Sequence, residues 1–124
     1  TDSNDLAQIC TTAAANSDVI YVPTDNTVAE NTGIIDNICS PAKIPVIAGE
    51  EGICKGCGVA TLSISYYDLG YATGKMAVKI LKGEANVSTM EIGYAETQTP
   101  KYNKRICDAL GITPLTGYVA IEEN

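Results

Sequence analysis

The fold is decided by the stretch VIYVPTDNT, residues 19–27. Its first four residues are apolar and mostly β-branched, which is typical of a short strand buried on both faces of a parallel sheet. Residues 23–26 end this strand. Thr27-Val28-Ala29-Glu30 then has the Ser/Thr-x-x-Glu spacing of a capping box, so a helix is expected to begin there. A strand that passes directly into a helix is the repeating unit of α/β proteins.

The same alternation continues along the chain. Helices are expected at residues 3–16, from Thr27 to a stop at Ser40-Pro41, at 65–83 and at 103–110, and strands at 19–22, 44–48, 59–65 and 91–95. This order predicts an α/β fold, a three-layer sandwich with a mostly parallel sheet. Such sheets normally begin on a strand, so we expect the chain to be part of a longer one that supplies a first strand before residue 3.

The composition argues against several classes of function. The formal net charge is −7, from 15 acidic and 8 basic residues, and such a surface repels the phosphate backbone of nucleic acids. Histidine is absent, which removes the most frequent general base and the most frequent zinc ligand. We therefore expect no nucleic-acid partner, no catalytic residue, no metal site and no cofactor.

The five cysteines fall into two groups. Cys10, Cys39 and Cys107 lie among apolar residues in expected helices and are interpreted as small buried hydrophobes. Cys54 and Cys57 form a Cys-x-x-Cys motif, which performs thiol–disulfide exchange when it opens a helix. Here the motif is expected between two strands, flanked by glycines and followed by no helix. A turn that a disulfide could close is the favoured interpretation, with redox catalysis as the alternative.

Candidate ligand contacts follow three of the expected strands, because ligands of open parallel sheets bind in the loops at the carboxyl ends of the strands. These loops, residues 24–27, 49–52 and 65–68, are rich in carboxylates, hydroxyls and amides and contain no Lys or Arg. Helix N-termini suit a carboxylate, and the acids suit an ammonium group. Of Tyr66 and Tyr67, one is expected to face the ligand and the other the core. The loops favour a zwitterionic or cationic small molecule.

The acids of these loops also have structural interpretations. Thr27 and Glu30 are expected to form the capping box, whereas Asp25 precedes that cap and is not needed for it. Asp25 is therefore the acid for which a functional role is favoured. Glu50 and Glu51 fit a ligand contact and a solvated turn equally well.

Three stretches resemble one known family in its order and spacing. They are VIYVPTDNT at 19–27, KIPVIAGEEG at 43–52, and YYDLG at 66–70 continuing to AVKILKGE at 77–84. Together they resemble the ABC transporter substrate-binding family, which includes tryptophan and tyrosine binders and has the type I periplasmic-binding-protein fold. The resemblance implies two α/β lobes that close on a ligand. Residues 1–90 would form most of the second lobe, 91–114 a crossover segment toward the hinge and first lobe, and 115–124 a C-terminal tail.

The resemblance also implies a function and a site. The chain would belong to the solute-binding subunit of an importer, located outside the cytoplasm in a periplasm or on a lipid anchor. It would bind a small amino-acid-like solute, such as an aromatic amino acid, and deliver it to a membrane permease. Asp25 would be the partner of the ligand amine. The residues carried over to the ligand site are Thr24, Asp25, Asn26, Thr27, Glu50, Glu51 and Tyr66.

Two features depart from the family pattern, namely the Cys-x-x-Cys motif after the Glu-Glu-Gly turn and residues 117–124. Two alternatives to transport stay open. One is a ligand-binding sensory domain of a regulator or receptor with the same fold, and the other is a dithiol redox protein that uses Cys54 and Cys57. Our expectation is a binding protein that is not an enzyme.

Overall fold

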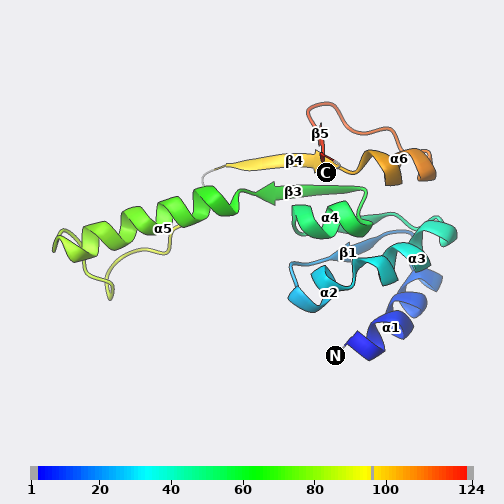
Figure 1. Ribbon diagram of the computed structural model, residues 1–124, viewed down its shortest axis with the longest axis horizontal. Helices are drawn as coiled ribbons and strands as arrows, with labels where there is room; N and C mark the ends of the chain where they lie inside the picture. The colour runs from blue at the N-terminus through cyan, green and yellow to red at the C-terminus, as the bar shows by residue number, and fades with distance from the viewer. Residues whose placement is uncertain (1–2, 96, 123–124) are drawn as a thin grey trace. The chain divides into compact units, whose positions relative to one another are not determined.

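The computed structural model describes residues 3–95 and 97–122 (Figure 1). These residues form two compact units, which we describe separately. The sheet unit contains the described residues up to Ser63 and those from Thr99 onward, and the helix unit is Ile64–Gln98. The division differs from the boundaries expected after residues 90 and 114, whose assignment to receptor lobes stays a prediction.

A five-stranded sheet organises the fold. The elements in chain order are α1 (Ser3–Ala15), β1 (Ile20–Val22), α2 (Asn26–Glu30), α3 (Thr32–Ala42), β2 (Val46–Ala48), α4 (Glu51–Cys57), β3 (Ala60–Ile64), α5 (Tyr66–Leu81), β4 (Gln98–Tyr102), α6 (Lys104–Leu110) and β5 (Val119–Ala120). The strand order is β1-β2-β3-β4-β5, in which β1, β2 and β3 are parallel and β4 is parallel to β5. The arrows of β3 and β4 point in opposite directions (Figure 1). The α/β class with a mostly parallel sheet is therefore confirmed.

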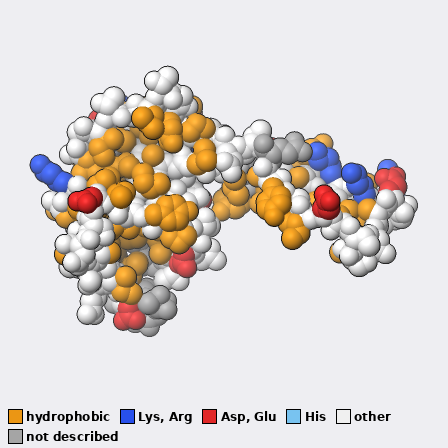
Figure 2. Space-filling view, turned by 180° about the vertical axis from the view of Figure 1, so that it is seen from behind, with side chains coloured by type: hydrophobic (Ala, Val, Ile, Leu, Met, Phe, Trp, Pro, Cys, Tyr) orange, Lys and Arg blue, Asp and Glu red, His pale blue; other side chains and the backbone are white. Residues whose placement is uncertain are grey.

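The strands bury alternate side chains on the face that the helices cover. Val22, Val46 and Ala48 are buried in one core cluster with residues of α1, α3 and α4. Tyr21, Ile47 and Leu62 have the opposite parity and remain 67%, 36% and 53% exposed. Hydrophobic side chains accordingly gather on the surface of the sheet unit in Figure 2. The described residues thus leave part of the second face of the sheet uncovered.

Two helix boundaries differ from those expected. The N-cap of the second expected helix lies two residues earlier than expected, at Asp25 instead of Thr27. Its continuation α3 runs through Pro41 to Ala42, so the stop expected at Ser40-Pro41 is wrong. Pro41 lies in the last turn of α3. Because proline has no N–H group, it removes one hydrogen bond close to the end of the helix. Lys43, with φ 56°, ends α3 in the left-handed conformation.

The Cys-x-x-Cys motif lies inside helix α4, so the expected turn without a helix is wrong. Glu50 is the N-cap of α4, and its carboxylate accepts hydrogen bonds from the backbone N–H groups of Gly52 and Ile53. Ile53 and Cys54 are completely buried in the core of the sheet unit. The capping carboxylate of Glu50 and the burial of the apolar inner face therefore stabilise α4 more than its two glycines, Gly52 and Gly56, destabilise it.

The strand expected at residues 91–95 is also wrong, because the structure places no strand there and forms β4 at Gln98–Tyr102. Residues 91–95 lie in the helix unit, where a Cβ on Gly93 would be 3.1 Å from the sulfur of Met76 in α5. This close approach shows that the segment packs against α5 instead of extending the sheet.

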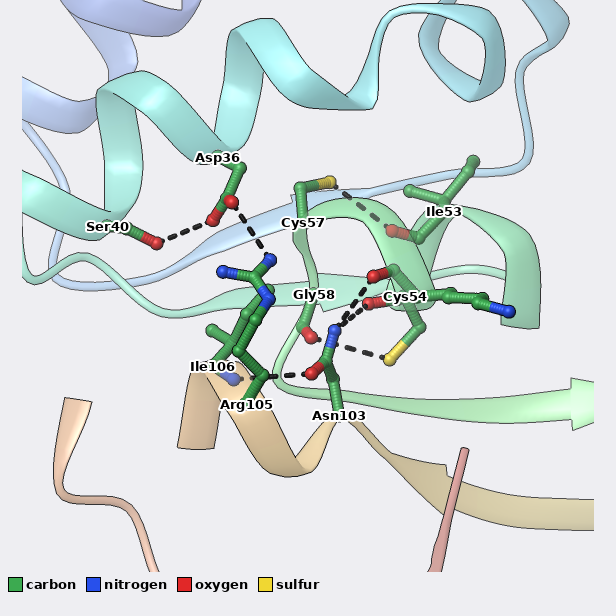
Figure 3. A network of polar contacts seen from close by, with 10 residues as sticks. Asp36, Ser40, Ile53, Cys54, Cys57, Gly58, Asn103, Arg105 and Ile106 are labelled. Atoms are coloured by element: carbon green, nitrogen blue, oxygen red, sulfur yellow. Dashed lines mark hydrogen bonds and ion pairs between the residues drawn. The ribbon is translucent and has the colours of Figure 1, made fainter. Parts of the chain in front are cut away.

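Local signals in the second half of the chain predict the helices well. The Ser65 hydroxyl caps α5 by accepting from the Asp68 N–H at 3.1 Å, as the capping-box spacing indicates. Asn103 caps α6, and Gly111 ends it with φ 69°. In Figure 3, Asn103 also reaches α4, while Arg105 of α6 pairs with Asp36 of α3 at 2.9 Å. These polar contacts fasten α6 to the rest of the sheet unit.

The packing of α4 against the start of α3 can be tested at one glycine. A Cβ on Gly56 would overlap the side chain of Thr32, so Gly56→Ala should lower the free energy of unfolding by about 1–3 kcal/mol. Gly33→Ala is the matched control, because nothing lies within 4 Å of a Cβ at that α3 position. That control should gain up to about 1 kcal/mol from helix propensity. Urea unfolding followed by circular dichroism measures both, and equal stabilities would contradict the observed packing.

Candidate ligand-binding site

The loops after β1 and β2 lie in contact at one edge of the sheet. Val22 and Ala48 are the paired last residues of these parallel strands, and the Gly49 N–H donates to the Val22 carbonyl at 2.8 Å. A Cβ on Gly49 would lie 2.8 Å from the backbone nitrogen of Thr24, so this approach requires glycine. Helices α2 and α4, which follow the two loops, also contact each other. Six of the seven predicted ligand contacts are thereby brought to one edge of the sheet unit.

Asp25 has a structural role that the sequence interpretation missed. Its Oδ1 atom accepts a hydrogen bond from the Val28 N–H at 2.9 Å, so Asp25 is the cap that it was expected to precede. The expectation that Asp25 is not needed for capping is therefore wrong. The side chain is nevertheless exposed, and a carboxylate can accept further hydrogen bonds on its second oxygen. Capping thus orients Asp25 without using up its capacity to bind a ligand amine.

The neighbours of Asp25 surround it with polar groups. Thr24 and Asn26 are exposed, and Thr27 is half-buried in the first turn of α2. The Thr27 carbonyl accepts from the Asn31 side chain at 2.7 Å, and Thr27 is not the cap. The exposed side chains of this loop are therefore those of residues 24–26.

Glu50 and Glu51 both have partners within the protein. Glu50 caps α4 through both carboxylate oxygens. Glu51 Oε2 lies 2.6 Å from the Nζ atom of Lys101 in β4, and both side chains are partly buried. The interpretation as a simple solvated turn is wrong for both residues. Lys101 was missed because the strand that carries it was expected at residues 91–95.

The charge of this edge stays acidic despite Lys101. Asp25, Glu50 and Glu51 contribute three carboxylates against one ammonium group. Glu50 and Glu51 are partly buried, and the charges of partly buried groups are screened less by salt than those of exposed groups. The preference for a cationic or zwitterionic ligand that the loop sequences indicate stays a prediction.

Tyr66 belongs to the helix unit, unlike the other predicted contacts. It is the first residue of α5 and is 58% exposed, and Tyr67 is 79% exposed. The expectation that one of the two rings packs in the core is therefore wrong. The helix unit also carries an open apolar hollow of about 620 Å³ on α5, lined by Gly70, Tyr71, Gly74, Lys75, Val78 and Lys79. No carboxylate is among the residues that line this hollow.

The Cys-x-x-Cys thiols are arranged as core residues. Cys54 Sγ is 3.6 Å from the Gly58 carbonyl and Cys57 Sγ is 3.4 Å from the Ile53 carbonyl (Figure 3). Both are free and buried, and burial is the main cause that raises the pKa of each thiol to about 12. Catalytic dithiols instead have a lowered pKa and an exposed sulfur. Among the described residues, no group of three or more His, Cys, Asp or Glu side chains is placed to hold a metal ion.

Comparison with known proteins identifies the family. Residues 1–116 match the family model described as "ABC transporter substrate binding protein". The chain belongs to this family. A tyrosine-binding protein of Clostridioides difficile (strain R20291) is 35% identical to the chain over 83 residues, which are 67% of the chain and 24% of that protein. Members of this family are substrate-binding proteins, which are not enzymes.

Solved structures agree with this membership. A ligand-free, open substrate-binding protein with adhesive properties from Clostridium difficile has 37% identity and a TM-score of 0.75, and covers 100% of the chain. An ABC domain from Streptococcus pneumonia in complex with L-Trp has 31% identity and a TM-score of 0.81, and covers 95% of the chain. The chain spans 42% of each of these proteins. In the described part of the chain, no helix has the length and apolar character needed to cross a bilayer.

The chemical state of the Cys-x-x-Cys motif can be tested by alkylation. With a pKa of about 12 instead of 9.0, the thiolate fraction of Cys54 and Cys57 at pH 8 falls roughly a thousandfold. Iodoacetamide should therefore label both residues at least about a thousandfold more slowly in the native protein than in urea, as read by peptide mass mapping. Labelling of the native protein at the rate of glutathione would contradict this assignment.

The same shift predicts a pH dependence of stability. Unfolded thiols lose their protons near pH 9.0 and native ones near 12, so the native state retains protons that the unfolded state releases. The thiols' contribution is fully present below pH 9 and is lost as the pH rises toward 12. Between pH 8 and 10 each thiol should lower the free energy of unfolding by about 1.4 kcal/mol. Urea titrations at several pH values measure this slope, and replacing Cys54 and Cys57 by Ala should reduce it.

Proposed function

We propose that this chain is part of the solute-binding subunit of an ABC importer and that its β1 and β2 loops form one side of the ligand cleft. The observation that carries the proposal is the contact between these loops, which the Gly49 N–H and the Val22 carbonyl hold together at 2.8 Å. This contact collects the polar residues of two loops at the carboxyl edge of a parallel sheet, where α/β proteins bind ligands. Membership of the substrate-binding family supports the same edge.

The proposed ligand is a small amino-acid-like solute with an aromatic side chain. The acidic excess of the edge favours an ammonium group, and the second carboxylate oxygen of Asp25 is its proposed acceptor. Relatives support the aromatic part, because one is a tyrosine-binding protein and another was solved with L-Trp. Tyr66, in the helix unit, stays a predicted aromatic contact.

The remaining candidates have supporting roles in this proposal. Thr24, Asn26 and Thr27 are proposed to supply polar contacts from the β1 loop. Glu50 and Glu51 are proposed to act chiefly through the shape and negative potential of the β2 loop, because Glu50 caps α4 and Glu51 pairs with Lys101. A direct contact from either remains a prediction.

The proposed location and partner of the protein follow from its proposed role in solute import. A receptor that delivers a solute to a membrane permease works outside the cytoplasm, either in a periplasm or on a lipid anchor. The dithiol alternative is not favoured, because both thiols are buried in α4 and their pKa is raised. The sensory-domain alternative has no observation of its own in its favour.

Part of the cleft is proposed to come from residues beyond this chain, since the L-Trp complex is more than twice as long. The 124 residues alone should therefore bind an aromatic amino acid weakly or undetectably. The binding test uses this sequence within a polypeptide of the full length of its relatives.

Asp25→Asn separates the two roles of Asp25. Asparagine caps helices as well as aspartate does, so the melting temperature should stay within about 2 °C of the parent. Loss of the charge-assisted bond to the ammonium group should weaken binding of L-Trp or L-Tyr by about tenfold to a hundredfold. Isothermal titration calorimetry measures the affinity, with Asp18→Asn, an exposed acid in the turn before β1, as the matched control.

Two results would overturn this proposal. Unchanged affinity in Asp25→Asn would remove Asp25 from the site while leaving the family intact. Binding of sugars or phosphates with no response to any amino acid would refute the proposed ligand class.

A further inference from the structure

The core of the sheet unit contains two cysteines whose sulfur atoms face each other. Cys10 lies in α1 and Cys39 in α3, and their Sγ atoms are 3.6 Å apart. Both belong to the same buried cluster, with relative exposures of 7% and 2%. Helices α1 and α3 pack along each other, so the two sulfurs are held together by a contact between elements that are distant in sequence.

The other three thiols are engaged differently. Cys54, Cys57 and Cys107 each place the sulfur 3.4–3.6 Å from a backbone carbonyl, those of Gly58, Ile53 and Val59 respectively. Among the described residues, Cys10 and Cys39 are therefore the two cysteines whose sulfur atoms are in contact with each other. The Cys-x-x-Cys motif, which the sequence singles out, is not that pair.

We propose that Cys10 and Cys39 form a disulfide that fastens α1 to α3 when the protein meets a disulfide oxidant. An S–S bond is about 2.05 Å long, so the sulfurs must approach by about 1.5 Å, within the reach of side-chain rotation and a small shift of α1. The oxidant is a reactive disulfide, either a small molecule such as glutathione disulfide or the active site of a thiol oxidase.

The exchange balances as two steps. The Cys10 thiolate attacks the oxidant disulfide, forms a mixed disulfide and releases one thiolate. The Cys39 thiolate then attacks Cys10 Sγ, forms the Cys10–Cys39 bond and releases the second thiolate. The two protons of the cysteines end on the two released thiols, and two electrons pass from the cysteine sulfurs to the oxidant.

The order of the steps follows from exposure. Cys10 is the less buried of the two and lies on α1, the helix at the start of the chain. Burial and the neighbouring Cys10 raise the pKa of Cys39 to about 12, which disfavours Cys39 as the first nucleophile. Once Cys10 carries the oxidant, Cys39 attacks from an adjacent position and needs no access to solvent.

The bond would stabilise the sheet unit. It closes a loop of about 30 residues and restricts the unfolded chain, which should raise the melting temperature of this unit by roughly 10 °C or more. Dithiothreitol should reverse the rise. The stabilisation would then depend on the redox state of the protein's surroundings.

The test oxidises the purified chain with excess glutathione disulfide at pH 8.5, quenches it with acid, alkylates it in urea and maps peptides without reduction. The expected product links the peptides of Cys10 and Cys39, leaves Cys54, Cys57 and Cys107 alkylated and melts at a higher temperature. Cys54→Ala with Cys57→Ala should leave this product unchanged, whereas Cys10→Ala should abolish both the link and the rise. The mapping of the parent chain decides the outcome even where a variant does not fold.

Three results would overturn the proposal. They are five alkylated cysteines after an incubation that fully oxidises a control dithiol, a Cys54–Cys57 link as the main product, and disulfide-linked dimers as the main product. None of them bears on ligand binding, so the proposed function is tested separately.

Discussion

The buried side chain of Asn103 connects the end of α4 to the start of α6, and the sheet unit depends on this connection. Its Nδ2 atom donates to the carbonyls of Cys54 and Lys55 in the last turn of α4, at 3.1 and 2.9 Å, and its Oδ1 atom accepts from the Ile106 N–H at 3.2 Å. Its backbone N–H donates to the Val59 carbonyl at 3.0 Å. Asn103 is only 6% exposed, so without it these groups would lose partners in a buried position, where an unpaired polar group is costly.

Two residues before Asn103, Lys101 pairs with Glu51 at the other end of α4. The segment from Lys101 to Asn103 thus holds α4 at both ends, and α4 in turn supports the β2 loop.

Two acids of the candidate site cap helices, and the same carboxylates are among those predicted to contact the ligand. A helix N-terminus needs an acceptor for its free N–H groups, and Asp25 and Glu50 supply one to α2 and α4. A capping carboxylate is held in one orientation, which reduces the entropy that a ligand contact must overcome. Structural and binding roles are therefore compatible in Asp25, whose side chain is exposed. They compete in Glu50, which uses both oxygens for the cap.

The parts of the fold that depend on local chemistry were predictable from sequence. The helix start at Ser65 and the helix expected at residues 103–110 depend on residues within one helical turn, and the structure confirms them. Helix α4 was missed because its N-cap is a glutamate, outside the usual set of Ser, Thr, Asp and Asn. The strand β4 was missed because pairing with β3 depends on a partner more than thirty residues away. The grouping of the β1 and β2 loops was predictable, because neighbouring parallel strands end at the same edge of a sheet. The ion pair between Glu51 and Lys101 was not predictable, because it joins segments that are distant in sequence and that no local pattern connects.

Helix α5 has no buried residue along its sixteen positions. Its backbone amides should therefore be less protected from hydrogen exchange than those of the sheet unit. A helix whose side chains are at most half-buried gains little from tertiary packing, and its own hydrogen bonds are marginal at this length in water. Its backbone amides should exchange with deuterium through local fraying, whereas those of α4, around the fully buried Ile53, should exchange only when the sheet unit opens as a whole. Hydrogen exchange would then resolve two opening free energies in one polypeptide. A single melting temperature therefore reports on the sheet unit and says little about α5.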